Sequence, residues 1–186
     1  MRGCSNLSNT MEVLNMNKII NIGNKESAIK VIKQIKEKDY VPFDLKITNS
    51  HIMSLNEKIG FVVFRKDSLY INSHSLWELM QPLGDKGSHN HHELTEEDIY
   101  IALTSIKEPY AILDACDNKN SKTRYSIISI KLSHFKDPFM IVIEVGAELR
   151  NVINANINKV VTIYPMSDYD DYVKNYDIKG VLYCKL

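Results

Sequence analysis

The second half of the chain alternates between apolar and polar positions, a period of two that is typical of β-strands with one buried face. Polar spacers at 117–122 and 136–138 separate the first three runs, so we expect neighbouring strands to pair as antiparallel hairpins. A polar stretch at 168–176 fits one short helix before the last strand. The alternating runs are 111–115, 123–132, 139–147, 159–164 and 181–185.

A period of 3.6 residues replaces this alternation over 95–106, where the spacing predicts the clearest helix of the chain. Thr95 followed by Asp98 resembles a capping box at the start of this helix, and Pro109 ends it. The apolar face of the helix consists of Ile99, Ala102, Leu103 and Ile106.

Shorter helical and strand patterns occupy the first half of the chain. Asn24 can cap a helix that runs to about Lys38, and Ser73 can cap a second helix that ends near residue 80. The expected strands are 43–47 and the two arms of a hairpin within 60–72, which turns at 66–68.

Together these patterns predict an α+β fold in which N-terminal helices pack on a four- to five-stranded antiparallel sheet. The first residues show no period, so we expect them to be a disordered tail. The expected layout is a tail at 1–17, an N-terminal α+β region at 18–83, a polar histidine-rich loop at 84–94 and an α+β domain at 95–186.

The composition fits a globular protein, because 44% apolar residues in 186 suffice for a buried core. The formal net charge is zero, so no overall field draws the chain to nucleic acid or to an anionic membrane. No apolar run approaches the roughly 20 residues that cross a bilayer, and the polar N-terminus lacks a secretion signal. Three widely spaced cysteines indicate reduced thiols. We therefore expect a cytoplasmic protein without membrane contact.

Three of the six histidines, His89, His91 and His92, stand just before the predicted helix at 95–106. Structural zinc usually takes four ligands and commonly a cysteine, and no cysteine lies nearby, so we expect no metal. Histidine is the usual general acid or base near neutral pH, which favours chemistry by His92, or by His74 at the other helix start. Motifs for a nucleophilic serine or cysteine and for nucleotide phosphates are absent, and we expect no cofactor.

Several polar residues interrupt the apolar strands, where a half-exposed sheet would place them for solubility alone. They also have the side chains that hold and cleave a phosphodiester, because guanidinium and ammonium groups bind phosphate and hydroxyls donate hydrogen bonds. Neighbouring strands could bring them together on one concave face. The residues are Arg124, Tyr125, Glu144, Lys159, Thr162 and Tyr164.

A resemblance to phage-associated domains of the barnase, EndoU, colicin-tRNase and RelE (BECR) superfamily is carried by HHELTEEDIYIALTSIKEPYAIL, RYSIISIKL, KDPFMIVIEVGA and NANINKVVTIYPMSDYDDYVK. More narrowly, these segments are similar to the C-terminal domain of phage MuF-type proteins. The resemblance covers about residues 90–186. Its most specific parts are the P-x-x-I-L after the helix and the late residues Asn156, Asn158, Thr162, Tyr164 and Pro165.

The resemblance implies that 95–186 is an RNase-like domain of a toxin or effector that cleaves RNA by 2′-OH attack without a metal. No long delivery module precedes this domain, which leaves open a free-standing protein of phage or mobile-element origin or a copy that has lost activity. In such a reaction a histidine transfers protons, and cationic or hydroxyl side chains bind the phosphate. The expected catalytic residues are His92 or His74 with Arg124, Thr162 and Tyr164, and the expected RNA-binding residues are Lys159, Tyr125 and Asn158.

The acidic stretch at 91–119, with seven Asp or Glu and two Lys, supports a second hypothesis. A phage or mobile-element protein on the same fold could bind and inhibit a host protein through this stretch without catalysis. The expected partners are therefore RNA, and a host protein or a cognate antitoxin.

Overall fold

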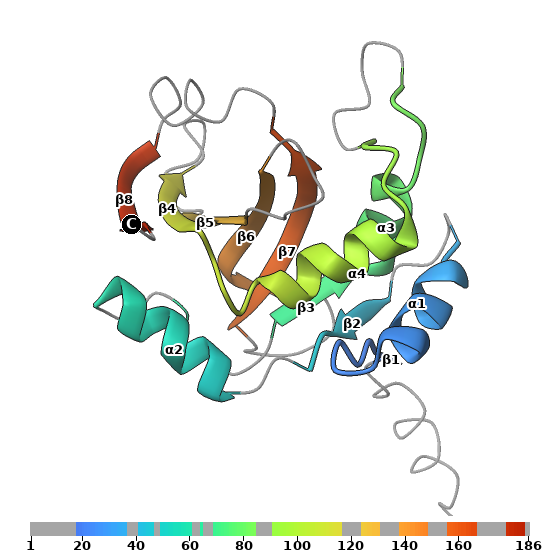
Figure 1. Cartoon of the computed structure of the whole chain (residues 1–186), viewed down its shortest axis with the longest axis horizontal. Helices are drawn as coiled ribbons and strands as arrows, with labels where there is room; N and C mark the ends of the chain where they lie inside the picture. Colours follow the sequence, from blue (N-terminus) through green and yellow to red (C-terminus); the bar gives the residue numbers. More distant parts are fainter. Residues whose placement is uncertain are drawn as a thin grey trace, which may run out of the picture.

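The computed structural model describes residues 18–36, 41–46, 49–60, 64, 69–84, 91–116, 124–130, 138–148, 156–166 and 178–184. Within these ranges the chain is α+β, as expected, and eight strands form one sheet in the order β1-β2-β3-β7-β6-β5-β4-β8 (Figure 1). The strands are β1 (Lys18–Ile19), β2 (Pro42–Asp44), β3 (Leu69–Asn72), β4 (Ala111–Cys116), β5 (Arg124–Ile130), β6 (Phe139–Glu148), β7 (Asn156–Pro165) and β8 (Ile178–Cys184). The helices are α1 (Lys25–Lys33), α2 (Asn49–Ile59), α3 (Ser73–Leu79) and α4 (Glu96–Ser105).

The hairpins expected from the alternating pattern are present. Strands β4 and β5, β5 and β6, and β6 and β7 pair antiparallel, and β8 adds to the free edge of β4 in the same sense. These five strands each have an apolar face that can be buried on one side of the sheet.

The sheet as a whole is mixed, so the prediction of an antiparallel sheet is wrong. Strand β3 runs parallel to β7, with Ile71 opposite Val160, and β1 runs parallel to β2. Parallel neighbours are joined by long connections, and the connection from β3 to β7 includes α3, α4 and three strands. A local pattern of apolar residues reports hairpins, but it cannot report a pairing between segments that far apart.

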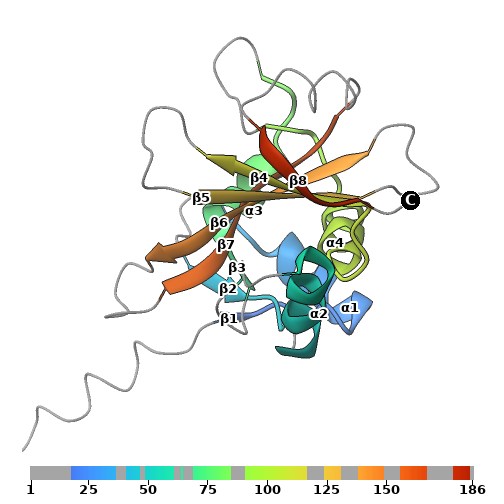
Figure 2. The ribbon, with the colours of Figure 1, turned by 90° about the vertical axis from the view of Figure 1, so that its left-hand side faces the viewer.

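Helices α1, α2 and α4 gather on one side of the sheet (Figure 2). The helix that Asn24 caps ends at Lys33 instead of near Lys38, because Gln34 already occupies the C-cap. Buried residues from both halves of the chain form a single apolar cluster, in which Ile71 and Val160 are each fully buried. Residues of the 18–83 region thus complete the core of the later strands.

Two local predictions for the first half are wrong. Helix α2, which contains His51, was not expected from the sequence. Asn72, not Ser73, is the N-cap of α3: the Asn72 side chain accepts a hydrogen bond from the backbone N–H of His74 at 2.8 Å. Ser73 is instead fully buried, and its hydroxyl accepts a hydrogen bond from the N–H of Val41.

Some predicted segments cannot be compared with the structure. The tail at 1–17, the first arm of the expected hairpin at 61–63 and the expected helix at 168–176 lie outside the described residues. The second arm of that hairpin is β3, which pairs with β2 and β7.

Shared burial of the two halves predicts that they unfold together. Replacing Ile71 by Ala removes a fully buried side chain between β2 and β7, and we expect a loss of about 2–5 kcal/mol in the free energy of unfolding. Urea denaturation followed by far-UV circular dichroism and by Trp77 fluorescence should give one coincident transition, shifted to lower urea. Met53→Ala, at a position with 54% exposure, is the control and should change stability by less than about 0.5 kcal/mol. Separate transitions for the two probes would contradict a common core.

Candidate active site

The short segment before α4 is held against the end of α3. The backbone N–H of Glu93 donates to the carbonyl of Gln81 at 2.8 Å, and the N–H of Leu94 donates to the carbonyl of Leu79 at 3.0 Å. Glu93 has a positive φ of 52°, which is uncommon for a residue with a side chain. Because such backbone strain persists only where the surroundings enforce it, the conformation of this segment is fixed by its neighbours.

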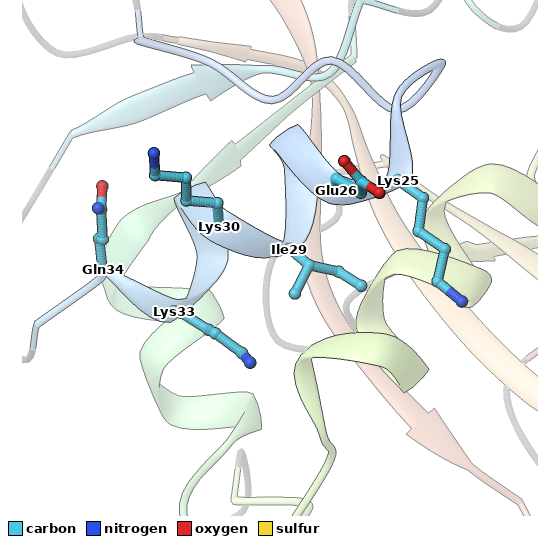
Figure 3. Close-up of a pocket in the computed structure, with 6 residues that line it drawn as sticks. All are labelled: Lys25, Glu26, Ile29, Lys30, Lys33 and Gln34. Carbon is cyan, nitrogen blue, oxygen red and sulfur yellow. The ribbon is translucent and has the colours of Figure 1, made fainter.

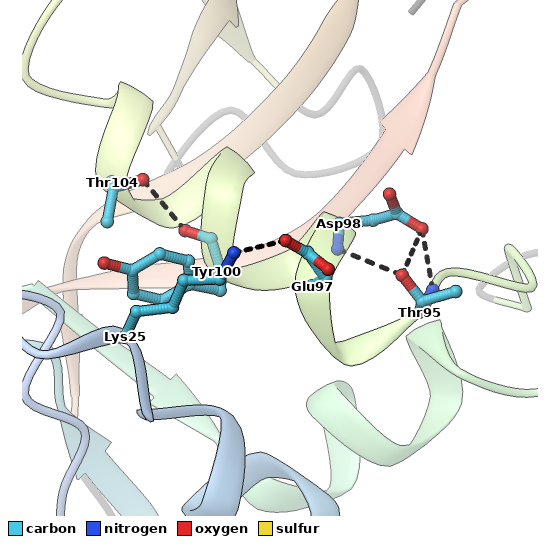
Figure 4. A network of polar contacts seen from close by, with 6 residues as sticks. All are labelled: Lys25, Thr95, Glu97, Asp98, Tyr100 and Thr104. Atoms are coloured by element: carbon cyan, nitrogen blue, oxygen red, sulfur yellow. Dashed lines mark hydrogen bonds and ion pairs between the residues drawn. The ribbon is translucent and has the colours of Figure 1, made fainter. Parts of the chain in front are cut away.

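Helix α4 fixes the other end of the segment (Figure 4). Thr95 and Asp98 form the predicted capping box: the Asp98 N–H donates to the Thr95 hydroxyl at 3.1 Å, and the Asp98 carboxylate accepts from the Thr95 N–H at 2.9 Å. In the same first turn, Glu97 forms an ion pair with Lys25 of α1. The hydrogen bond to Glu97 raises the pKa of Lys25. Helix α4 is therefore anchored to α1 at its first turn.

These restraints place His92 against β7. Its Nε2 lies 3.2 Å from the hydroxyl oxygen of Thr162, within hydrogen-bond distance. The imidazole also stacks on the ring of Tyr164, with centroids 5.4 Å apart and planes inclined by 29°. Three residues that the sequence analysis selected from segments 70 positions apart thus meet in one place.

The adjacent histidine contacts a different element. His91 meets Trp77 of α3 edge to face, with a centroid distance of 6.2 Å, and Trp77 stacks on His74 at 5.9 Å. His74 lies 3.6 Å from the carboxylate of Glu78. Trp77 thus connects His74 with His91, the neighbour of the candidate base.

Partial burial sets the charge of His92. Desolvation of the ring lowers its pKa below the ordinary value of 6.5, and the neighbouring His91 lowers it further. Hence His92 is neutral at pH 7 and able to accept a proton. No buried nitrogen or oxygen of a described side chain lacks a hydrogen-bond partner. The Nδ1 atom of His92 has no partner among these residues, so solvent or a ligand can reach it.

The register between β6 and β7 is interrupted next to this site. Thr162 pairs with Val142 and Val160 pairs with Ile143, which leaves Val161 as an extra residue on β7. An extra residue of this kind is a β-bulge, and it interrupts the alternation of side chains along the strand. Since cross-strand partners share a face, Thr162 and Val160 lie on opposite faces although they are two residues apart.

The bulge puts Lys159 on the same face as Thr162 and Tyr164. Lys159 pairs with Glu144 and therefore shares the face of Thr162 and Tyr164. Val160 lies on the other face, where it is fully buried in the core. Without the bulge, a regular strand would put Lys159 and Thr162 on opposite faces.

Asn158, Arg124 and Tyr125 are the other predicted site residues on these strands. Asn158 is only 2% exposed and pairs with Val145, and its expected contact with RNA stays a prediction. Arg124 also pairs with Val145. The side chains of Arg124 and Tyr125 lie outside the described part of the chain, and their roles stay predictions; Tyr125 pairs with Glu144.

The site coincides neither with a cluster of metal ligands nor with the open hollow along α1, as far as the described residues show. Within the described ranges, no three His, Cys, Asp or Glu side chains lie close enough to hold one ion. His89 lies outside these ranges. An open hollow along α1 is lined by Lys25, Glu26, Ile29, Lys30, Lys33 and Gln34 (Figure 3). It contains none of the predicted site residues.

No helix in the described part of the chain is long and apolar enough to span a bilayer.

Comparison with known families supports the narrower part of the resemblance, that to the phage MuF C-terminal domain. Residues 84–185, more than half of the chain, match the phage MuF C-terminal domain. The chain belongs to this family. No curated protein and no solved structure gave a significant match.

The MuF C-terminal domain contains the central contacts of the site, because His92, Thr162 and Tyr164 all lie within 84–185. Trp77 and His74 precede it, in α3. The sequence analysis did not select Trp77 or Glu93. Trp77 is the only tryptophan of the chain, and it stands three residues after His74, on the same side of a helix. That spacing was the signal available.

The lowered pKa of His92 predicts its titration in solution. The His92 Cε1 proton should titrate with a midpoint below 6.5 by NMR, and His91→Gln should move this midpoint upward because it removes a positive neighbour. His51→Gln on α2 should leave it unchanged. In the unfolded state the pKa of His92 is near 6.5, so below this pH the unfolded state binds more protons than the folded state. The free energy of unfolding should therefore decrease as the pH falls below 6.5. A His92 midpoint at or above 6.5 would contradict the partial burial of its ring.

Proposed function

We propose that this MuF C-terminal domain is an endoribonuclease of the BECR type, in a phage or mobile-element effector, and that His92 is its general base. The observation that supports this most is the contact of a half-buried, neutral imidazole with Thr162 and Tyr164 on one sheet face. The antiparallel strands β4 to β7 together with a preceding helix also fit the arrangement that the BECR resemblance implies.

In the proposed reaction His92 accepts the proton of a ribose 2′-OH, and the 2′ oxygen attacks the adjacent phosphorus. The bond from phosphorus to the 5′ oxygen breaks, and the proton held by His92 passes to that oxygen. The products are a 2′,3′-cyclic phosphate and a 5′-hydroxyl end, so no water or metal is consumed. A general base must be unprotonated at the working pH, and the lowered pKa of His92 satisfies this condition.

Thr162 and Tyr164 hold the base in position. In the neutral tautomer whose Nε2 carries the hydrogen, Nε2 donates to the Thr162 hydroxyl oxygen, and Nδ1 has the lone pair that accepts the proton of the substrate. The Tyr164 ring supports one face of the imidazole. Loss of either contact would allow the ring to rotate away from the substrate hydroxyl.

The alternative, inhibition of a host protein through the acidic stretch at 91–119, has less support. Of the three acids in the first turn of α4, Glu97 is paired with Lys25 and Asp98 caps the helix. These carboxylates stabilise the fold of this chain, so they are less available as a docking surface for a partner.

The test is cleavage of a single-stranded RNA by the full chain with EDTA present. His92→Ala should lower the initial rate by about 10²–10⁴-fold, the usual contribution of a general base. Thr162→Val should lower it less, because it removes one hydrogen bond and keeps the shape of the side chain. The cleaved fragments should carry cyclic phosphate and 5′-hydroxyl ends.

His51→Gln is the matched control, since it changes a half-buried histidine that lies on another element, α2. Its rate should equal that of the unaltered chain. Equal rates for His92→Ala and the unaltered chain would remove His92 from the mechanism. No cleavage by any variant, together with a stable complex with a host protein, would favour the inhibitor hypothesis.

A further inference from the structure

A half-buried lysine without an ion pair lies on the same sheet face as the candidate base. Lys159 stands directly opposite Glu144 across β6 and β7. Opposite charges at such positions usually attract, because cross-strand partners are about 5 Å apart at Cβ. Yet neither residue takes part in an ion pair within the described part of the chain, where the two pairs present are Lys25 with Glu97 and His74 with Glu78. The Lys159 ammonium is therefore available to another anion.

The β-bulge at Val161 determines where this ammonium can act. It puts Lys159 on the face of Thr162, which contacts His92. Lys159 and Thr162 stand opposite Glu144 and Val142, which are two residues apart on β6 and therefore about 6.6 Å apart along the strand. The long side chain of lysine spans a comparable distance. An anion bound beside Lys159 therefore lies within reach of the Thr162 hydroxyl.

We propose that Lys159 and Thr162 form an anion subsite that holds the phosphodiester of a single-stranded nucleic acid beside His92. This inference rests on the proposed function and names the group that places the phosphate. A neutral protein has no general attraction for a polyanion. A single lysine at the site would give such a protein local affinity for one phosphate.

The opposite charges of Lys159 and Glu144 allow the proposal to be tested, because their removal should change anion binding in opposite directions. Its carboxylate lies across from Lys159 and opposes any bound anion. Removing the positive charge should therefore weaken binding, and removing the negative charge should strengthen it. A lysine and a glutamate that serve only as polar residues of a solvent-exposed sheet face would show neither effect.

The experiment uses a 2′-deoxy dinucleotide, which has a charged phosphodiester but no 2′-OH to react. Binding to the full chain is measured by calorimetry and by the NMR shift of the His92 Cε1 proton. Lys159→Gln should weaken binding by about tenfold or more, as expected for the loss of a hydrogen bond to a charged group, and Glu144→Gln should tighten it. Lys159→Arg should retain binding. Lys58→Gln on α2 makes the same change of charge elsewhere and should have no effect.

Two further measurements separate a phosphate contact from a contact with the bases. An uncharged methylphosphonate dinucleotide of the same bases should bind no better to the unaltered chain than to Lys159→Gln. With a longer single strand, the slope of log affinity against log salt should fall by about 0.7 for Lys159→Gln, the value for one phosphate contact.

Three results would each overturn the subsite. They are unchanged affinity in folded Lys159→Gln, binding of the uncharged analogue as tight as that of the charged dinucleotide, and no binding of the charged dinucleotide at all. Thermal melting shows whether each variant is folded, and Lys159→Arg provides the charge-retaining comparison if Lys159→Gln is not. Because the probe cannot be cleaved, Lys159-dependent binding with no RNA cleavage would reject the proposed ribonuclease and leave the subsite standing.

Discussion

Two backbone hydrogen bonds between the segment before α4 and the end of α3 are the contacts on which the candidate site depends. They hold the backbone N–H groups of Glu93 and Leu94, and Glu93 has a positive φ angle. The residue before them, His92, is thereby ordered before any substrate arrives. A free loop would lose about 1–2 kcal/mol per residue in backbone entropy on ordering, and this cost is already met in the folded chain.

The same contacts make the first half of the chain necessary to the site. Only the later segment matches the MuF C-terminal domain, yet α3, which holds the His92 segment, lies before it. Strand β3 runs directly into α3 and pairs in parallel with β7, the strand that carries Thr162. The sheet pairing thus sets the distance between the element that holds the histidine and the strand that the histidine contacts.

The electrostatics of the molecule are local. The formal charge is zero, and two of the acidic residues near the site are used to start α4 and join it to α1. His92 itself is neutral, and it contacts Thr162 and Tyr164, which carry hydroxyl groups. Lys159, which makes no ion pair among the described residues, shares their sheet face. This combination suits recognition of a single phosphate in a narrow substrate better than capture of a long polyanion.

The sequence by itself determined the local structure: the capping box at Thr95, the cap at Asn24 and the hairpins from β4 to β7 depend on residues close together in the chain. It also named His92, Thr162 and Tyr164, since few side chains can move protons or hold phosphate. Only the tertiary structure decided that these three meet, because β3 pairs with β7 across a long connection and one extra residue at Val161 reverses the strand's faces. The same register buries Asn158. Pairing and bulges between distant segments leave no periodic trace in the sequence.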